Sequence, residues 1–174
     1  MVEVRLLGLP LELRARAQEH DHDLLRELAL IRVGADQPET GSVPARLLDL
    51  ADELRETYAA FSAGPNAQIE AATDAGLESL DVTYQVPTHA LSFVRRVRQT
   101  LEEVEQFSRD GRYLLTLVAP PEVAVYRRWV FAEFDSQILG GPAVPWSEAL
   151  ATVERPGRPS LDRREGRVRE PADG

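Results

Sequence analysis

A run of side chains that can bind metal ions or transfer protons lies early in the chain: Glu19, His20, Asp21, His22, Asp23 and Glu27. Residues three or four apart share a helix face, so His20 and Asp23 could supply two ligands to one metal ion. His20 and His22 would point in different directions, and the HExxH zinc motif is absent. The run therefore predicts a charged helix face with His20 at the edge of the core, and a metal site on His20 and Asp23 is the alternative.

Arginines that could bind an anion lie in two later segments, as Arg95, Arg96, Arg98, Arg127 and Arg128. A guanidinium group binds carboxylate or phosphate through two parallel hydrogen bonds. A groove between two helices that carry these arginines could hold an anionic small molecule. Acidic residues follow closely, and Arg98 with Glu102 has the spacing of an ordinary surface ion pair, so a paired surface is the alternative.

Two tryptophans lie near the second arginine group. Trp129 directly follows Arg127 and Arg128, and Trp146 lies downstream. Tryptophan and arginine are enriched at the energetic centres of protein interfaces. An exposed ring would mark a docking surface for another protein, whereas a buried ring would belong to the core.

The residue types exclude several kinds of chemistry. The chain has no cysteine, which excludes disulfides, thiolate nucleophiles and zinc sites built on sulfur. All 20 basic residues are arginine, and the absence of lysine excludes Schiff-base chemistry and the P-loop lysine. Neither a G-x-S-x-G nucleophile motif nor a glycine-rich phosphate loop is present. These absences favour a protein that is not an enzyme and that carries no cofactor.

Length and charge limit the class of protein further. A chain of 174 residues, 43% hydrophobic, is long enough for one well-buried domain. The net charge of −9 disfavours nucleic acid and anionic lipid as partners, because both require clustered positive charge. No stretch has the length and apolar character of a membrane span, and the amino terminus lacks a signal-peptide pattern. We expect a cytoplasmic protein.

The elements that would position these side chains are predicted from the apolar spacing. Alternating residues over 2–6 and 80–86 predict half-buried strands, and the apolar run at 113–118 predicts a short buried strand. A strand, helix, strand order would make the last two parallel neighbours, with the opening strand as a third member of the sheet.

Helical spacing predicts four helices: one at 11–32, one after Ser42, one after Thr88 and one at 122–139. The second carries apolar residues from Leu47 to Phe61 in the most regular period of the chain. Gly64-Pro65-Asn66 is expected to break it, and 67–75 could add one or two helical turns. Gly140-Gly141 is expected to end the last helix.

The carboxyl-terminal part carries few apolar residues. Pro142, Pro145 and Trp146 predict an extended segment folded back on the body, because burial of the indole ring is favourable. We therefore predict one mostly helical α+β domain over 1–150, with a sheet of two or three strands, and a disordered polar tail over 151–174.

Two segments of the sequence resemble known groups of proteins. Val-Thr-Tyr-Gln-Val-Pro at 82–87, followed by Val-Arg-Arg-Val-Arg, is similar to the opening strand and helix of the anti-sigma kinase type of ATPase domain. The nucleotide and asparagine boxes of that family have no counterpart, so ATP binding is not implied. The stretch 112–146, together with Val-Arg-Leu-Leu-Gly-Leu-Pro at 4–10, resembles a group of small uncharacterised actinobacterial proteins associated with partner-switching stress regulators. This second resemblance implies a regulatory role and brings no catalytic residues.

The sequence as a whole predicts a noncatalytic regulatory protein that binds another protein in a bacterial signalling or stress-response pathway. Its contact surface would be the last helix and the segment that ends at Trp146. The alternative is a small-molecule or anion-binding module, or an enzyme of unfamiliar type, that uses Arg95, Arg96, Arg127 and Arg128. A structural homodimer through the Leu47–Phe61 helix is the third possibility.

Overall fold

The computed structural model of the protein describes residues 1–34, 43–109 and 119–154. The predicted α+β fold is confirmed: the described chain is mostly helical and carries one two-stranded sheet. The strand predicted at 113–118 and tail residues 155–174 lie outside the described residues. In chain order the elements are β1 (Val2–Pro10), α1 (Leu11–Gly34), α2 (Val43–Glu53), the π-helix η1 (Leu54–Tyr58), α3 (Ala59–Asp74), β2 (Ser79–Val86), α4 (Ala90–Arg109), α5 (Pro121–Ile138) and α6 (Trp146–Glu154).

The sheet pairs β1 with β2 in antiparallel register, so that Val4 lies opposite Tyr84 and Leu6 lies opposite Val82. Val4, Leu6 and Val82 are buried, while the residues between them are more exposed. The predicted alternation is therefore confirmed for both strands. The opening strand belongs to the sheet, as expected.

A β-bulge lies in β1 between Leu6 and Leu9. Gly8 has a φ angle of +67° at this point, and its N–H donates a hydrogen bond of 2.7 Å to Asp81 Oδ1. The extra residue shifts the alternation along the strand, so that Leu6 and Leu9 are both buried.

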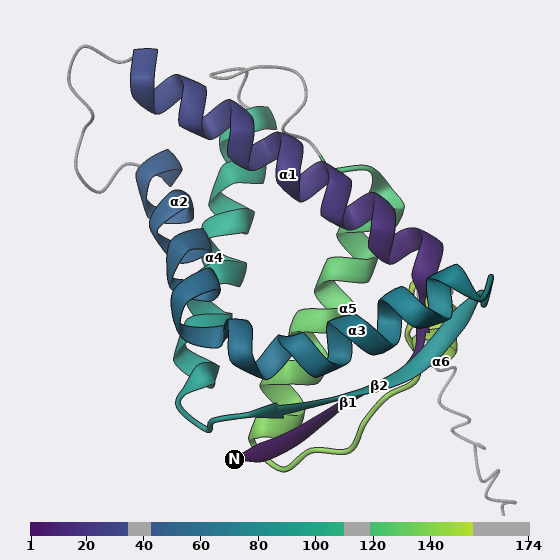
Figure 1. Ribbon diagram of the computed structural model, residues 1–174. Helices are drawn as coiled ribbons and strands as arrows, with labels where there is room; N and C mark the ends of the chain where they lie inside the picture. The colour runs from purple at the N-terminus through teal and green to yellow at the C-terminus, as the bar shows by residue number, and fades with distance from the viewer. Residues whose placement is uncertain (35–42, 110–118, 155–174) are drawn as a thin grey trace, which may run out of the picture.

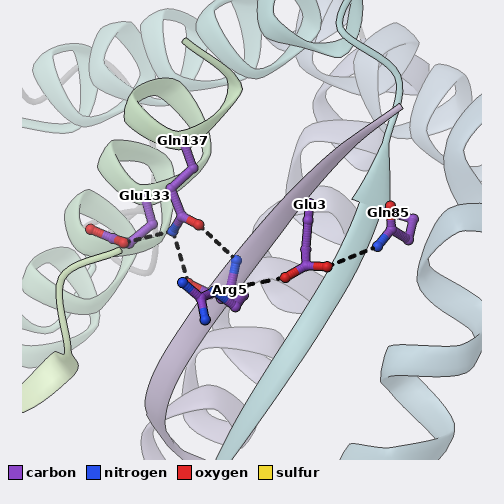
Figure 2. A network of polar contacts seen from close by, with 5 residues as sticks. All are labelled: Glu3, Arg5, Gln85, Glu133 and Gln137. Carbon is purple, nitrogen blue, oxygen red and sulfur yellow. Dashed lines mark hydrogen bonds and ion pairs between the residues drawn. The ribbon is translucent and has the colours of Figure 1, made fainter. Parts of the chain in front are cut away.

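One side chain of α5 covers the outer edge of β1 (Figure 2). Gln137 Oε1 accepts the backbone N–H of Arg5 at 2.9 Å, and Gln137 Nε2 donates to the carbonyl of Arg5 at 2.8 Å. The same Nε2 donates to Glu133 Oε2 at 2.8 Å. The amide therefore satisfies backbone groups that an edge strand would otherwise leave unpaired.

Four helices form a closed ring of contacts in the other half of the molecule. α1 packs against α2 and α5, and α4 packs against the same two helices. In Figure 1 these helices surround the centre of the molecule, and α3 lies with the sheet along one side. Side chains from all four helices line one region inside this ring.

The predicted break at Gly64-Pro65-Asn66 is wrong, because α3 continues through Pro65. An internal proline costs a helix roughly 3 kcal/mol. Ile69 and Ala72 on the following turns are buried against the sheet, and the burial of that face offsets the cost. The change of direction between α2 and α3 (Figure 1) lies instead at η1, the π-helical turn that ends at Tyr58.

The carboxyl-terminal segment is extended only as far as Pro145. Trp146 then begins α6, which the sequence did not predict, so residues 151–154 belong to a helix and not to a tail. α6 is only 9 residues long, too short for a clear apolar period. The predicted stop of α5 is confirmed, because Gly140 has a φ angle of +88° and its N–H donates to the carbonyl of Gln137 at 3.0 Å.

Candidate functional site

The arginines predicted to form an anion site do not converge. Arg95 binds Asp135 through its Nε and Nη2, at 2.5 and 3.1 Å, and Arg96 Nη2 binds both carboxylate oxygens of Glu53, at 2.6 and 2.9 Å. Their side chains are half exposed. These two arginines are therefore neutralised at the surface and do not form a shared pocket with the arginines of α5.

The two arginines of α5 differ from each other. Arg128 is exposed and has no carboxylate partner within the part of the chain that the structure describes. Arg127 is buried and forms an ion pair with Asp21 on α1. The side chain of Arg127 is 9% exposed, whereas that of Asp21 is 47% exposed. Arg127 Nε is also buried and has no hydrogen-bond acceptor among the described residues.

Burial and charge shift the ionisation of the groups around Arg127. Burial raises the pKa of Asp21 above its usual value, and the positive charge of Arg127 opposes that shift. Burial lowers the pKa of His20, and Arg127 lowers it further, against the opposing effect of Asp21, Asp23 and Glu105. His20 therefore favours its neutral form at the edge of the core.

The early His and Asp run lies on α1, as predicted, but its members are divided between different partners. Asp23 pairs with Arg26 at 2.9 Å, Asp21 pairs with Arg127, and His20 Nε2 is buried without a hydrogen-bond partner among the described residues. Within 1–34, 43–109 and 119–154, no three His, Asp or Glu side chains are grouped so that they could hold a metal ion.

The two tryptophans pack together and do not form an open docking surface. Trp129 is 5% exposed, and its Nε1 donates to the carbonyl of Val144 at 2.9 Å. The N–H of Val144 in turn donates to the buried carboxylate of Glu133 at 2.8 Å. The ring of Trp146 packs edge-on against the ring of Trp129, with 5.4 Å between the two ring centroids. These contacts confirm the predicted folding-back of the segment and place Trp129 in the core.

A cavity of about 330 Å³ lies within the helical ring, and we call it the four-helix cavity. Of its 15 lining residues, 13 are apolar and the other two are Asp21 and Arg127. The apolar residues come from α1, α2, η1, α4 and α5, and are Leu24, Leu25, Leu47, Leu50, Ala51, Leu54, Phe93, Val94, Val97, Leu101, Val130, Phe131 and Phe134.

The sequence predictions did not include this cavity, because the apolar spacing along one helix does not show whether the space between several helices is filled. One signal was present. Phe131 lies between Val130 and Phe134 in the sequence and widens the apolar face of the last helix, and all three residues line the cavity. A widened apolar face indicates more apolar surface than one neighbouring element covers.

The arrangement is suited to binding. Apolar walls would hold an apolar group by excluding water from it, and the single ion pair would distinguish one end of a bound molecule from the other. Among the described helices, none combines the length and the apolar character that crossing a lipid bilayer requires. Comparisons with protein-family models, with curated proteins and with solved structures found no match for this chain.

Proposed function

We propose that the protein is a noncatalytic binding module whose ligand is a small, mostly apolar molecule held in the four-helix cavity. The observation that carries this proposal is the lining of the cavity, which is apolar at 13 of 15 positions and charged only at the Asp21–Arg127 pair. Small-molecule sites in proteins have this composition, with volumes of roughly 300 to 1,000 Å³.

The size of the cavity favours a ligand over a packing defect. Protein interiors contain few voids larger than a water molecule. The four-helix cavity is open to solvent at Asp21 and Leu54, whose exposed fractions are 47% and 51%, so without a ligand its apolar walls would contact water. A bound apolar molecule would displace that water, which is favourable by roughly 25 cal/mol per Å² of apolar surface removed from water.

Binding of an uncharged fluorescent probe, N-phenyl-1-naphthylamine, tests the proposal. We expect saturable binding with one site per chain. Ala51→Phe places a ring in the cavity and should weaken binding about tenfold or more, which corresponds to about 1.4 kcal/mol. Ala132→Phe, on the exposed side of α5, is the matched control and should leave binding unchanged. Absence of saturable binding to the folded protein would contradict the proposal.

A protein partner with a regulatory role is the second candidate function. The observation in its favour is Leu54, which lies in η1, lines the four-helix cavity and is 51% exposed. π-Helical turns occur frequently at functional sites. A leucine that lies both in the cavity and at the surface could change its position when a ligand binds, and so alter the binding of a protein partner. Leu54→Ser should then reduce capture of a partner from host lysate, whereas Leu139→Ser, at another exposed leucine, should not.

A further inference from the structure

A second hollow, of about 190 Å³, adjoins the four-helix cavity. The two spaces share four lining residues: Asp21, Arg127, Val130 and Phe131. Along α1 the cavity extends from Asp21 toward Leu25, while the hollow extends in the opposite direction from Asp21 to Arg14. The ion pair therefore lies at the junction of an apolar space and a more polar one.

The hollow contains a positive charge that no carboxylate neutralises. Arg14 Nη1 donates to Gln18 Oε1 at 2.9 Å, and its Nη2 donates to Asn66 Oδ1 at 3.1 Å. Both partners are neutral amides, and no carboxylate pairs with Arg14 within 1–34, 43–109 and 119–154. Arg127 is balanced by Asp21, so the lining of the hollow carries one net positive charge.

Two further side chains with hydrogen-bond donors line the hollow. One is Arg127, whose guanidinium group already pairs with Asp21. The hydroxyl-bearing ring of Tyr126 also lines the hollow. A phenol is protonated at neutral pH and can donate a hydrogen bond, and burial raises the pKa of Tyr126 further.

We propose that the ligand is an anionic amphiphile, with its apolar chain in the four-helix cavity and its anionic head in the adjoining hollow between Arg14 and Arg127. This inference rests on the proposed function and adds the chemical class of the ligand. A head group with oxygen acceptors would balance the charge of Arg14 and could accept hydrogen bonds from donor side chains that line the hollow. The chain attached to it would pass the ion pair and replace water along the leucine and phenylalanine walls.

The test compares decanoate with decan-1-ol, which have the same chain and differ in the charge of the head. Binding of each to the full chain is measured at neutral pH by displacement of N-phenyl-1-naphthylamine. We expect decanoate to bind about tenfold more tightly than decan-1-ol. Arg14→Gln should abolish that preference, Arg14→Lys should keep most of it, and Arg128→Gln, which removes an exposed arginine outside both spaces, should leave it intact.

The outcomes separate the two proposals. Equal binding of decanoate and decan-1-ol would overturn the anionic head site and leave the apolar cavity supported. Failure of the probe and both compounds to bind would overturn the cavity as a ligand site as well. If Arg14→Gln does not fold, as judged by its thermal unfolding, Gln18→Leu tests the same hollow, because it removes a neutral partner that orients Arg14. A preference for decanoate that is equally strong in every variant would contradict the assignment of Arg14.

Discussion

The side-chain amide of Gln137 binds both backbone groups of Arg5, at 2.9 and 2.8 Å, and so replaces the strand that would otherwise pair with the edge of β1. Gln137 is 6% exposed, so water does not readily substitute for it. α5 is fixed to the sheet by this contact, and α5 also supplies Arg127 to the junction of the two ligand spaces. The geometry of the proposed site therefore depends on the attachment of α5 to β1 (Figure 2).

Gln137→Leu should lower the free energy of unfolding by about 3 kcal/mol, because it leaves the N–H and carbonyl of Arg5 without partners in a poorly hydrated place. Urea denaturation monitored by circular dichroism measures the loss. Gln99→Leu is the matched control, since Gln99 is exposed and, among the described residues, its amide bonds only to Glu103. It should change the free energy by about 0.5 kcal/mol or less. Similar losses in the two variants would refute the role assigned to Gln137.

The Asp21–Arg127 pair should respond asymmetrically to substitution. Asp21→Asn leaves the buried guanidinium of Arg127 without a counter-charge and should cost about 3 kcal/mol. Arg127→Met should cost less, because the side chain of Asp21 is 47% exposed and its carboxylate can be hydrated. The double variant should be more stable than Asp21→Asn alone. Additive losses in this double-mutant cycle would show that the two residues do not interact energetically.

Trp129→Phe should reduce the free energy of unfolding by about 2 kcal/mol, because the carbonyl of Val144 loses its donor and the smaller ring leaves a void. Trp146 is the control, since its indole N–H has no hydrogen-bond partner among the described residues. Trp146→Phe should cost about half as much or less. Chemical denaturation of both variants gives the comparison, and an equal loss would contradict a specific role for the Val144 hydrogen bond.

The lowered pKa of His20 predicts that the stability of the protein depends on pH. Its pKa in the folded protein is below the ordinary value of 6.5, so the unfolded chain binds more protons than the folded chain as the pH falls through 6.5. The free energy of unfolding should therefore decrease as the pH is lowered from about 8 to about 5. His20→Gln should reduce this slope, whereas His22→Gln, at an exposed position, should not. An unchanged slope in His20→Gln would assign the pH dependence to other groups.

Two glycines should respond in opposite directions to alanine. Gly140 has a φ angle of +88°, where an alanine side chain is strained, and Gly140→Ala should cost about 1–2 kcal/mol. Gly64 lies inside α3, and a Cβ at that position would meet no atom within 4 Å. Gly64→Ala should therefore stabilise the protein by about 0.5–1 kcal/mol. Thermal unfolding distinguishes the signs, and destabilisation by Gly64→Ala would indicate that α3 is strained near Pro65.

Local spacing was enough to predict the class of fold and most of the elements. Alternation over 2–6 and 80–86 predicted both described strands, because side chains on a strand point to opposite faces in turn. The glycines after Leu139 predicted the end of α5, because glycine alone adopts the left-handed conformation at no steric cost. These features depend only on neighbouring residues, so the sequence by itself determined them.

Which of the polar side chains are buried was decided by the tertiary structure. Arg127 and Arg128 are adjacent and chemically identical in sequence, yet only Arg127 faces Asp21 across the interface of α5 with α1. Local rules also placed a helix break at Pro65, where long-range burial of the following turns keeps the chain helical. Burial and ion pairing are set by residues distant in sequence, which no local period encodes.

The four-helix cavity is the feature furthest from what the sequence could show. Its wall residues read as ordinary core positions on each helix taken alone, and the sequence determined only that these faces are apolar. Whether four apolar faces fill the space between them depends on the distances and angles at which the helices pack. Those distances and angles leave about 330 Å³ between the helices, and the tertiary structure alone placed the Asp21–Arg127 pair at its end.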